Sequence, residues 1–246
     1  MSINHITVTK IIKIIDAVKR FQEALGDSID AEVIRACFRK IYAEILSEEA
    51  ITFDADYILQ GSLATDFIES GARGEAIKIK THHNIGLELS RPQLHPLEDL
   101  FKYEVRELAL TLGLPEEIAY CHPFPGPGLY IRTPGVPATL EILEIARWAN
   151  TIATRILKEE KIYDGLSQLV VGLWGLKTTG VAGDERKYEF SAVVRAVITA
   201  DFMTAQGVYF EERVFRKINR EIVKHPRIVR CLLDPTDKPP ATTEFQ

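Results

Sequence analysis

Hydrophobic residues recur at helical spacing in two stretches of the first half of the chain. Residues 30–49 place their apolar side chains on one face, and Asp30 can cap that helix at its start. Residues 97–112 repeat the pattern and end at Gly113, where a C-cap glycine belongs. Between them, the short apolar run at 56–60 predicts a buried strand.

Two other stretches of this half have a less regular pattern. Most of residues 11–25 fits a helix, although the β-branched residues at 11–15 equally suit a short buried strand that leads into it. From 71 to 96 the periodicity is lost, and a loop of that length is often a functional lid. We therefore expect a long mobile loop there.

The segment HPFPGPG, residues 122–128, contains three prolines and two glycines, which excludes a helix or a central strand. We take it as the domain boundary. Beyond it, two helices and a few strands predict an α+β domain that ends in the polar tail DPTDKPPATTEFQ. Helices are expected at 139–158 and 209–224, and strands at 166–175, 187–199 and 227–233, with the turn-rich GVAGDERK between the first two strands.

The composition is that of an ordinary soluble protein. With 46% hydrophobic residues, 246 residues can bury a core, and the net charge of -5 argues against a general nucleic-acid binder, which needs a basic face. No apolar run approaches the length of a membrane span, and the first residues lack a signal-peptide pattern. We expect a cytoplasmic protein with reduced thiols at Cys37, Cys121 and Cys231.

The first candidate site follows the strand expected at 56–60. The tripeptide Gln60-Gly61-Ser62 ends that strand, and Asp66 and Glu69 come next at a spacing that puts them on one helix face. A carboxylate pair where a strand feeds a helix can hold Mg²⁺ together with substrate phosphates. Alternatively, the pair is a solvated acidic helix start, which the helix dipole favours.

A second cluster lies within the expected lid and consists of Lys78, Lys80, His82, His83 and Asn84. Its cations and imidazoles could neutralise phosphate charge when the loop closes, or they belong to an exposed basic loop. Adjacent histidines point apart and no third ligand is spaced for zinc, so we predict no metal site.

Three further segments have both a functional and a structural interpretation. The glycines of HPFPGPGL permit close approach of a ligand, unless the loop is only a stiff hinge. Arg186 could bind a phosphate or pair with a carboxylate across a dimer, or it belongs to a charged hairpin. The tail is disordered by default, but its stiff Pro-Pro could fix Lys238 for a phosphate and Glu244 for a base.

Taken in order, the motifs closely resemble those of the GMP synthetase family. This chain has QGS followed by DFIES, then IKTHHNIG, HPFPGPGL, GVAGDERKY, VVRAV and KPPATTE. The family has QGT with DxIES, IKSHHN or IKTHHN, HPFPGPGL, GVxGDERTY, LRAV and KPPATIE. The resemblance runs from about Ile14 to the end, and HPFPGPGL and KPPAT are its most specific parts.

The resemblance implies a fold and a reaction. Residues 1–121 would be a truncated, doubly wound α/β domain of the adenine-nucleotide α-hydrolase-like type, and residues 122–246 a dimerisation domain that completes the XMP pocket. The family makes GMP from XMP, ATP and ammonia: an ATP-pyrophosphatase domain adenylates XMP, and ammonia from a glutaminase displaces AMP. The implied partners are a second copy of the chain, XMP or GMP, a chain that supplies the ATP loop and a glutamine amidotransferase, with ATP and Mg²⁺ as cofactors if the chain is active.

The resemblance also implies roles for individual residues. The catalytic set would be Asp66, Glu69, Lys80, His82 and His83. The ATP-binding set would be Gln60, Gly61 and Ser62. The substrate-binding set would be Gly126, Pro127, Gly128, Arg132, Arg186, Lys238, Thr243 and Glu244.

The main departure from the family is the absence of the motif SGGVDSS from these 246 residues. In the family, the backbone amides of this motif cradle the ATP pyrophosphate. Smaller departures occur at five positions: Ser62 replaces threonine, Lys177 replaces arginine, Thr243 replaces isoleucine, Phe245 replaces tryptophan and Gln246 replaces glutamate.

Three hypotheses follow. The chain is an XMP-aminating component completed by another polypeptide, a non-catalytic regulatory homologue that binds XMP or GMP, or an enzyme with altered chemistry on a purine nucleotide.

The missing motif leads to a testable prediction about ATP. The 246-residue chain alone should not release pyrophosphate from ATP, because backbone amides preorganised at a helix start are hard to replace by scattered side chains. Pure protein is incubated with XMP, Mg²⁺, ammonium and labelled ATP, and pyrophosphate is followed against a protein-free blank. Steady release above the blank would contradict the prediction.

Overall fold

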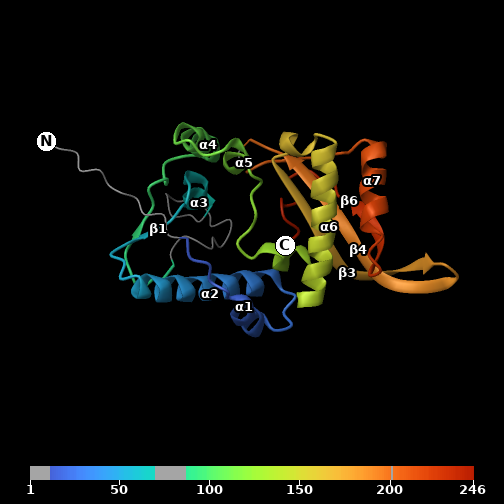
Figure 1. The fold of residues 1–246 in the computed structure, drawn as a ribbon, viewed down its shortest axis with the longest axis horizontal. Coiled ribbons are helices and arrows are strands. Elements are labelled where there is room, and N and C mark those ends of the chain that lie inside the picture. The colour runs from blue at the N-terminus through green and yellow to red at the C-terminus, as the bar shows by residue number, and fades with distance from the viewer. Residues whose placement is uncertain (1–11, 70–86, 201) are drawn as a thin grey trace.

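The computed structural model describes residues 12–69, 87–200 and 202–246 (Figure 1). Within these residues the elements form two groups that lie side by side, with the C-terminal end of the chain between them (Figure 1). We call them the N-terminal group, which contains the described elements between Val18 and Ala119, and the sheet group, which contains those between Gly128 and Leu233.

The N-terminal group is held together by local caps and by contacts between its first helices. The α2 helix begins where the sequence predicts, because the Asp30 carboxylate accepts the N–H groups of Glu32 and Val33 at 2.8 and 3.0 Å. Arg20 of α1 donates two hydrogen bonds to Glu48 of α2, at 2.7 and 2.8 Å. The elements are α1 (Val18–Leu25), α2 (Ala31–Thr52), β1 (Ile58–Leu59), α3 (Ala64–Glu69), β2 (Gln93–Leu94), α4 (Lys102–Thr111) and α5 (Glu116–Ala119).

Two interpretations of the sequence need correction in this group. The alternative of a buried strand at 11–15 is wrong, because Ile12 and Ile14 are 78% and 90% exposed. The loop expected at 71–96 lies partly outside the described residues, but its later part contains β2 and the buried Leu87. The sequence shows no hydrophobic periodicity there because β2 has only two residues, too few for an alternation of buried and exposed side chains to be recognised.

The helix expected over 97–112 is shorter than its apolar pattern. It begins only at Lys102, where the carboxylate of Glu104 reaches back to accept the N–H of Phe101 at 2.7 Å. Gly113 follows its end with a φ of 81°, the left-handed conformation that favours glycine. The predicted C-terminal end of the helix is therefore confirmed. Its N-terminal end is set by the contact between the Glu104 side chain and the Phe101 backbone.

The fold of the described N-terminal group is mixed α/β. Its sheet has two strands, which pair in parallel with Ile58 opposite Gln93. A doubly wound domain needs more parallel strands than the described residues supply. The adenine-nucleotide α-hydrolase-like arrangement and the domain boundary after residue 121 stay predictions.

The sheet group matches the expected α+β pattern, with two helices on one sheet. Its central strand, β4, pairs antiparallel with β3 and β5 and parallel with β6. The segment GVAGDERK is not mainly a turn: β3 and β4 continue through it, and the chain reverses at Gly183 and Asp184. The elements are η1 (Gly128–Arg132), α6 (Leu140–Glu159), η2 (Tyr163–Gly165), β3 (Gln168–Ala182), β4 (Glu185–Ile198), β5 (Gln206–Gly207), α7 (Glu212–Ile222) and β6 (Ile228–Leu233).

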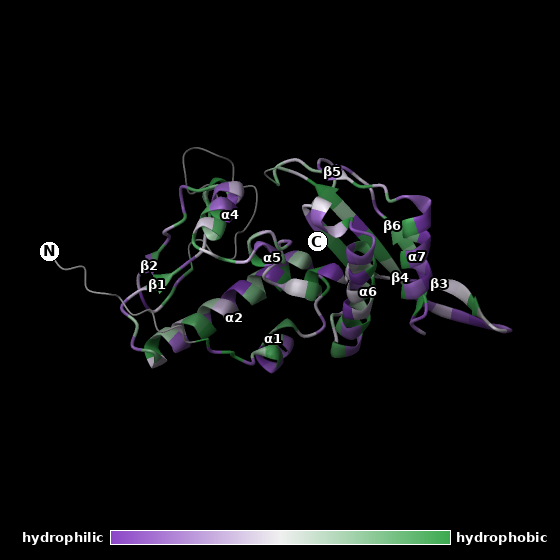
Figure 2. Cartoon of the chain, turned by 45° about the horizontal axis from the view of Figure 1, so that its top comes forward, coloured by the Kyte–Doolittle hydropathy of each residue, from purple (hydrophilic) through white to green (hydrophobic). Residues whose placement is uncertain are grey.

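Alternation along β3 gives this sheet two different faces. Leu169, Val171 and Leu173 belong to the core formed with α6 and α7. Gln168 and Gly172 point the other way, where Gln168 contacts the tail and Gly172 lies against η1 and the tail. Figure 2 shows hydrophobic residues concentrated on the strands and mixed with hydrophilic ones along α6. The end of the chain therefore covers the second face, on the side away from α6 and α7.

None of the helices in the described ranges is both long and apolar enough to cross a membrane.

Close packing at Gly172 leads to a stability prediction. A Cβ atom there would lie 2.4 Å from the carbonyl oxygen of Arg132 and 2.8 Å from the ring of Phe245, so Gly172→Ala should lower the free energy of unfolding by roughly 1–3 kcal/mol. Gly165→Ala is the matched control, because nothing lies within 4 Å of its Cβ position. Urea unfolding of both variants checks this, and equal stabilities would contradict it.

Candidate functional site

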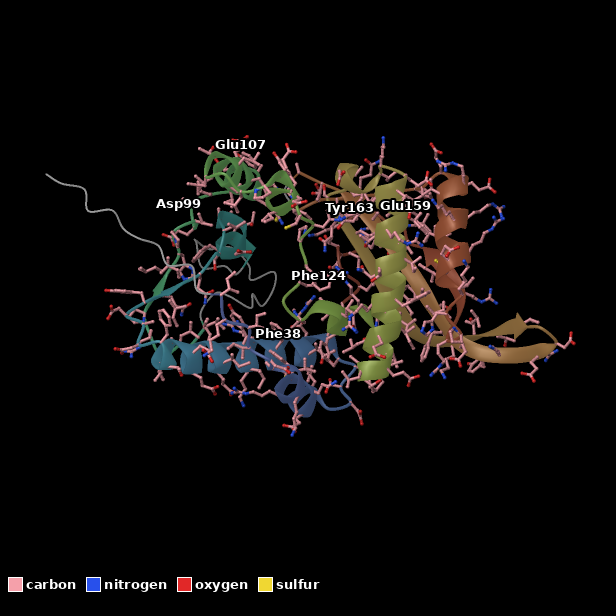
Figure 3. All side chains as sticks on the ribbon, viewed as in Figure 1. Phe38, Asp99, Glu107, Phe124, Glu159 and Tyr163 are labelled. Carbon is pink, nitrogen blue, oxygen red and sulfur yellow. The ribbon has the colours of Figure 1, made fainter. Side chains whose placement is uncertain are left out.

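A cavity of about 430 Å³ lies between the two groups of elements. Its walls come from α2, the start of α3, the start of α4, the HPFPGPG loop, β3 and the tail. Figure 3 shows Phe124 of that loop in the middle of the molecule, between the N-terminal group and the sheet. The polar lining residues are Arg35, Thr65, Asp66, Lys102, Tyr103, Gln168, Lys238, Thr242, Thr243, Glu244 and Gln246.

The strongest polar contact at the cavity joins Arg132 to Glu244. The guanidinium is 1% exposed and donates through Nε and Nη2 to the two carboxylate oxygens, at 2.9 and 2.8 Å. Gln168 donates a third hydrogen bond to Glu244, at 2.6 Å. Two parallel charge-assisted bonds fix the carboxylate plane, so Arg132 positions Glu244 at the cavity wall.

The HPFPGPG loop is held rigidly beside this pair. The ring of His122 stacks on Tyr163 with centroids 3.9 Å apart, and burial lowers the pKa of His122. The ring of Phe124 lies 4.5 Å from the guanidinium of Arg132, a cation–π contact. Gly128 has a φ of 62° and sits against Phe124, where a side chain would be strained.

The tail is a fixed part of the site, contrary to the default of a disordered terminus. Arg195, 1% exposed, donates to the carbonyl oxygens of Thr236 and Thr243 at 2.6 and 3.2 Å. The backbone of Lys238 bridges to Ala205, and its ammonium donates to a carbonyl in the loop that follows β4. A buried guanidinium therefore holds the tail through hydrogen bonds to its main-chain oxygens.

The tail also reaches the N-terminal group. Arg35 of α2 donates through Nη2 to the main-chain oxygen of Gln246, and the Gln246 side-chain amide donates to the carbonyl of Ile29 at 3.3 Å. The cavity is therefore closed on one side by a contact between residues far apart in the sequence.

Only one carboxylate of the predicted pair can be placed at the cavity. Asp66 lines it and accepts the N–H of Leu63 at 2.8 Å. Glu69 ends α3, and its side chain lies outside the described part of the structure. Of the predicted lid residues, Lys78, Lys80, His82, His83 and Asn84 also lie outside the described residues.

The remaining predicted residues lie elsewhere. Gln60 and Ser62 are buried, Gly61 is exposed, and none of these three lines the cavity. Arg186 is exposed near the tip of the β3–β4 hairpin. The structure thus brings together the two specific motifs, HPFPGPGL and KPPATTE, and leaves the hairpin apart from them.

Three lining residues escape prediction from the sequence alone. Arg35 is one of three cations in a helix that has an ordinary amphipathic pattern, and Lys102 begins another such helix. Gln168 is the first residue of β3. No local signal distinguishes them, because only the packing of the two groups brings them to one cavity.

The charge balance of the cavity favours an anion. Arg35, Lys102 and Lys238 line it and outnumber Asp66, whereas Glu244 is already neutralised by Arg132. Its volume falls in the range of small-ligand pockets, roughly 300–1,000 Å³. The described residues contain no group of three or more side chains that could hold a metal ion, although one carboxylate, Asp66, is enough to help a phosphate hold Mg²⁺.

The fold and the cavity define a mixed α/β protein with a basic cavity of the size that small ligands occupy. Comparison with known proteins then shows what the chain is similar to. Residues 155–245 match the family described as the GMP synthase C terminal domain. Proteins named glutamine-hydrolyzing GMP synthase are 42% identical in Thermus thermophilus over 95% of this chain, 39% in Fusobacterium nucleatum over 96%, and 38% in Yarrowia lipolytica over 96%.

The chain is therefore similar to glutamine-hydrolyzing GMP synthases over nearly all of its own length. It covers 47% of each of those three relatives, so it spans about half their length.

Removal of Glu244 tests the central ion pair. Glu244→Ala leaves the buried guanidinium of Arg132 without its carboxylate and should lower the free energy of unfolding by roughly 3–5 kcal/mol. The double variant Arg132→Met with Glu244→Leu removes both charges and should recover most of that loss. Urea unfolding measures both, and a double variant no more stable than Glu244→Ala would contradict this account.

Proposed function

We propose that the cavity binds a purine nucleoside monophosphate, XMP or GMP. The observation that carries the proposal is the convergence of HPFPGPGL and the KPPATTE tail on one basic cavity of about 430 Å³. The relatives named GMP synthase support the same ligand class.

The geometry of Glu244 supports a purine that carries a ring N–H. A carboxylate has about four acceptor positions, and three of those of Glu244 are used by Arg132 and Gln168. The bonds from Nη2 of Arg132 and from Gln168 both go to Oε1, so the open position is on Oε2. A base with a ring N–H can donate there. Adenine, which has an acceptor at that ring position, would face an unpaired carboxylate.

The phosphate end is assigned to Lys238. This residue lines the same cavity as Glu244, and the backbone on either side is held by Ala205 and Arg195. A cation fixed in this way can bind a phosphate without a large loss of side-chain entropy.

The finer proposal is amination of XMP to GMP through adenyl-XMP, by this chain together with a polypeptide segment that supplies the ATP loop and a glutamine amidotransferase that supplies ammonia. Asp66 would then help to hold Mg²⁺, with ATP as the second cofactor. The alternative is a regulatory homologue that binds the nucleotide without catalysis, and altered chemistry on a purine nucleotide is a third hypothesis. Affinity for XMP without any AMP release, with a complete set of partners present, favours the regulatory role.

A homodimer is part of the proposal. Several large apolar side chains on the β3–β4 hairpin and on β6 are exposed, and exposed apolar surface suits pairing with a second copy. They are Leu176, Val181, Tyr188 and Leu232.

The proposal predicts the effect of removing one ammonium. Lys238→Ala should weaken GMP and XMP binding about tenfold to a hundredfold, because a charge-assisted contact contributes roughly 1.5–3 kcal/mol. AMP should bind weakly to the wild type. Calorimetry measures all three ligands, with the exposed Lys19→Ala on α1 as a matched control. Failure of the wild type to bind any purine monophosphate would overturn the proposed function.

A further inference from the structure

Lys102 is a cation in an unfavourable position. It is the first residue of α4, where the helix dipole disfavours positive charge, and it lines the cavity. Among the described residues no carboxylate forms an ion pair with it, and Arg106 of the same helix repels it. A charge held at such a disadvantage for stability is a mark of a functional site.

Phe202 connects this lysine to the tail. The ammonium of Lys102 lies 5.3 Å from the centre of the Phe202 ring, and the ammonium of Lys238 donates to the Phe202 carbonyl oxygen. Phe202 has a φ of 64°, a left-handed conformation that is unusual for a bulky residue. The hydroxyl of Thr199 accepts the Phe202 N–H at 3.0 Å and helps to hold that conformation. Phe202 thus contacts both Lys102 of the N-terminal group and Lys238 of the tail.

We propose that Lys102 binds the phosphate of the nucleotide together with Lys238, so that the N-terminal group and the tail close on one phosphate. This rests on the proposed function of the cavity. In GMP the phosphate is the anionic part of the molecule, and Glu244 fixes the base at the Arg132 end of the same cavity. A phosphate between two ammonium groups also compensates for the repulsion between them.

Binding through Lys102 should depend on pH. Burial and the charge of Arg106 lower the pKa of Lys102 to about 8, although Cys121 and Asp66 act in the opposite direction. Lys238 is the charged group that faces it from the tail, across Phe202. A bound phosphate favours the ammonium and raises its pKa. Binding should therefore take up a proton near pH 8, and affinity should fall as the pH rises from about 7 to about 9.5.

The test compares GMP with guanosine, which lacks only the phosphate. Lys102→Gln should weaken GMP binding about tenfold to a hundredfold and leave guanosine binding unchanged. Lys102→Arg should retain most of the GMP affinity, because the charge is kept. Lys40→Gln on the exposed face of α2 is the matched control and should match the wild type. Calorimetry at about pH 7 and about pH 9.5 should show a smaller pH dependence for Lys102→Gln than for the wild type.

Thermal unfolding separates this role from a structural one. Lys102→Gln removes a largely buried charge that has no ion-pair partner among the described residues, so its melting temperature at about pH 7 should be at least that of the wild type. If the wild type binds GMP and Lys102→Gln binds it equally well, the inference is wrong while the proposed function stands. Equal losses for GMP and guanosine would also overturn the inference, because the phosphate would then not be the group contacted. Failure of the wild type to bind GMP is the separate outcome that removes the proposed function.

Discussion

The site depends on a buried ion pair that ties the end of the chain to the open face of the sheet. Taking the Arg132 guanidinium out of water is unfavourable unless its N–H groups find acceptors in the protein. Glu244 supplies the two strongest acceptors, and Asn150 lies 3.4 Å from the remaining nitrogen. The tail must fold back for Arg132 to be buried, and once it does, Thr243 and Lys238 also come to the cavity.

The sheet makes this arrangement possible because its two faces have different chemistry. In β4, Ala192, Val194 and Ala196 pack under the helices, while Arg195 points to the tail. A shift of the pairing by one residue would exchange those faces and bury the guanidinium in the helix-facing core. Hydrophobic packing against the helices thus fixes the register of the strands. The same register determines where the polar side chains lie on the face that contacts the tail.

Charges on the outside of the molecule follow different rules from those at the cavity. Glu159, at the upper end of α6 in Figure 3, pairs with Arg155 and Lys217 on the surface. Such exposed pairs contribute little to stability, typically about 0.2–1 kcal/mol each. In the cavity water is partly excluded, so the same charges interact more strongly with a ligand. Net charge is a sum over the whole chain, so a chain of net charge -5 can still contain a basic cavity where Arg35, Lys102 and Lys238 gather.

The sequence by itself determined the elements whose signals are local. Asp30 and Gly113 mark helix ends through their own backbone contacts, and the prolines of HPFPGPG exclude regular structure wherever the chain folds. The specific motifs also indicated Lys238 and Glu244, which the structure places at one cavity.

Tertiary structure decided what depends on contacts between distant residues. The strands β3 and β4 extend through a turn-like sequence because each stabilises the other by pairing, and the tail is fixed because Arg195 and Arg132 require its acceptors. Arg35 and Lys102 reach the cavity only because α2 and α4 pack around it. Helix ends and turns depend on a few neighbouring residues, so the sequence reveals them. A buried charge and a cavity depend on contacts between distant segments, which form only when the whole chain is folded.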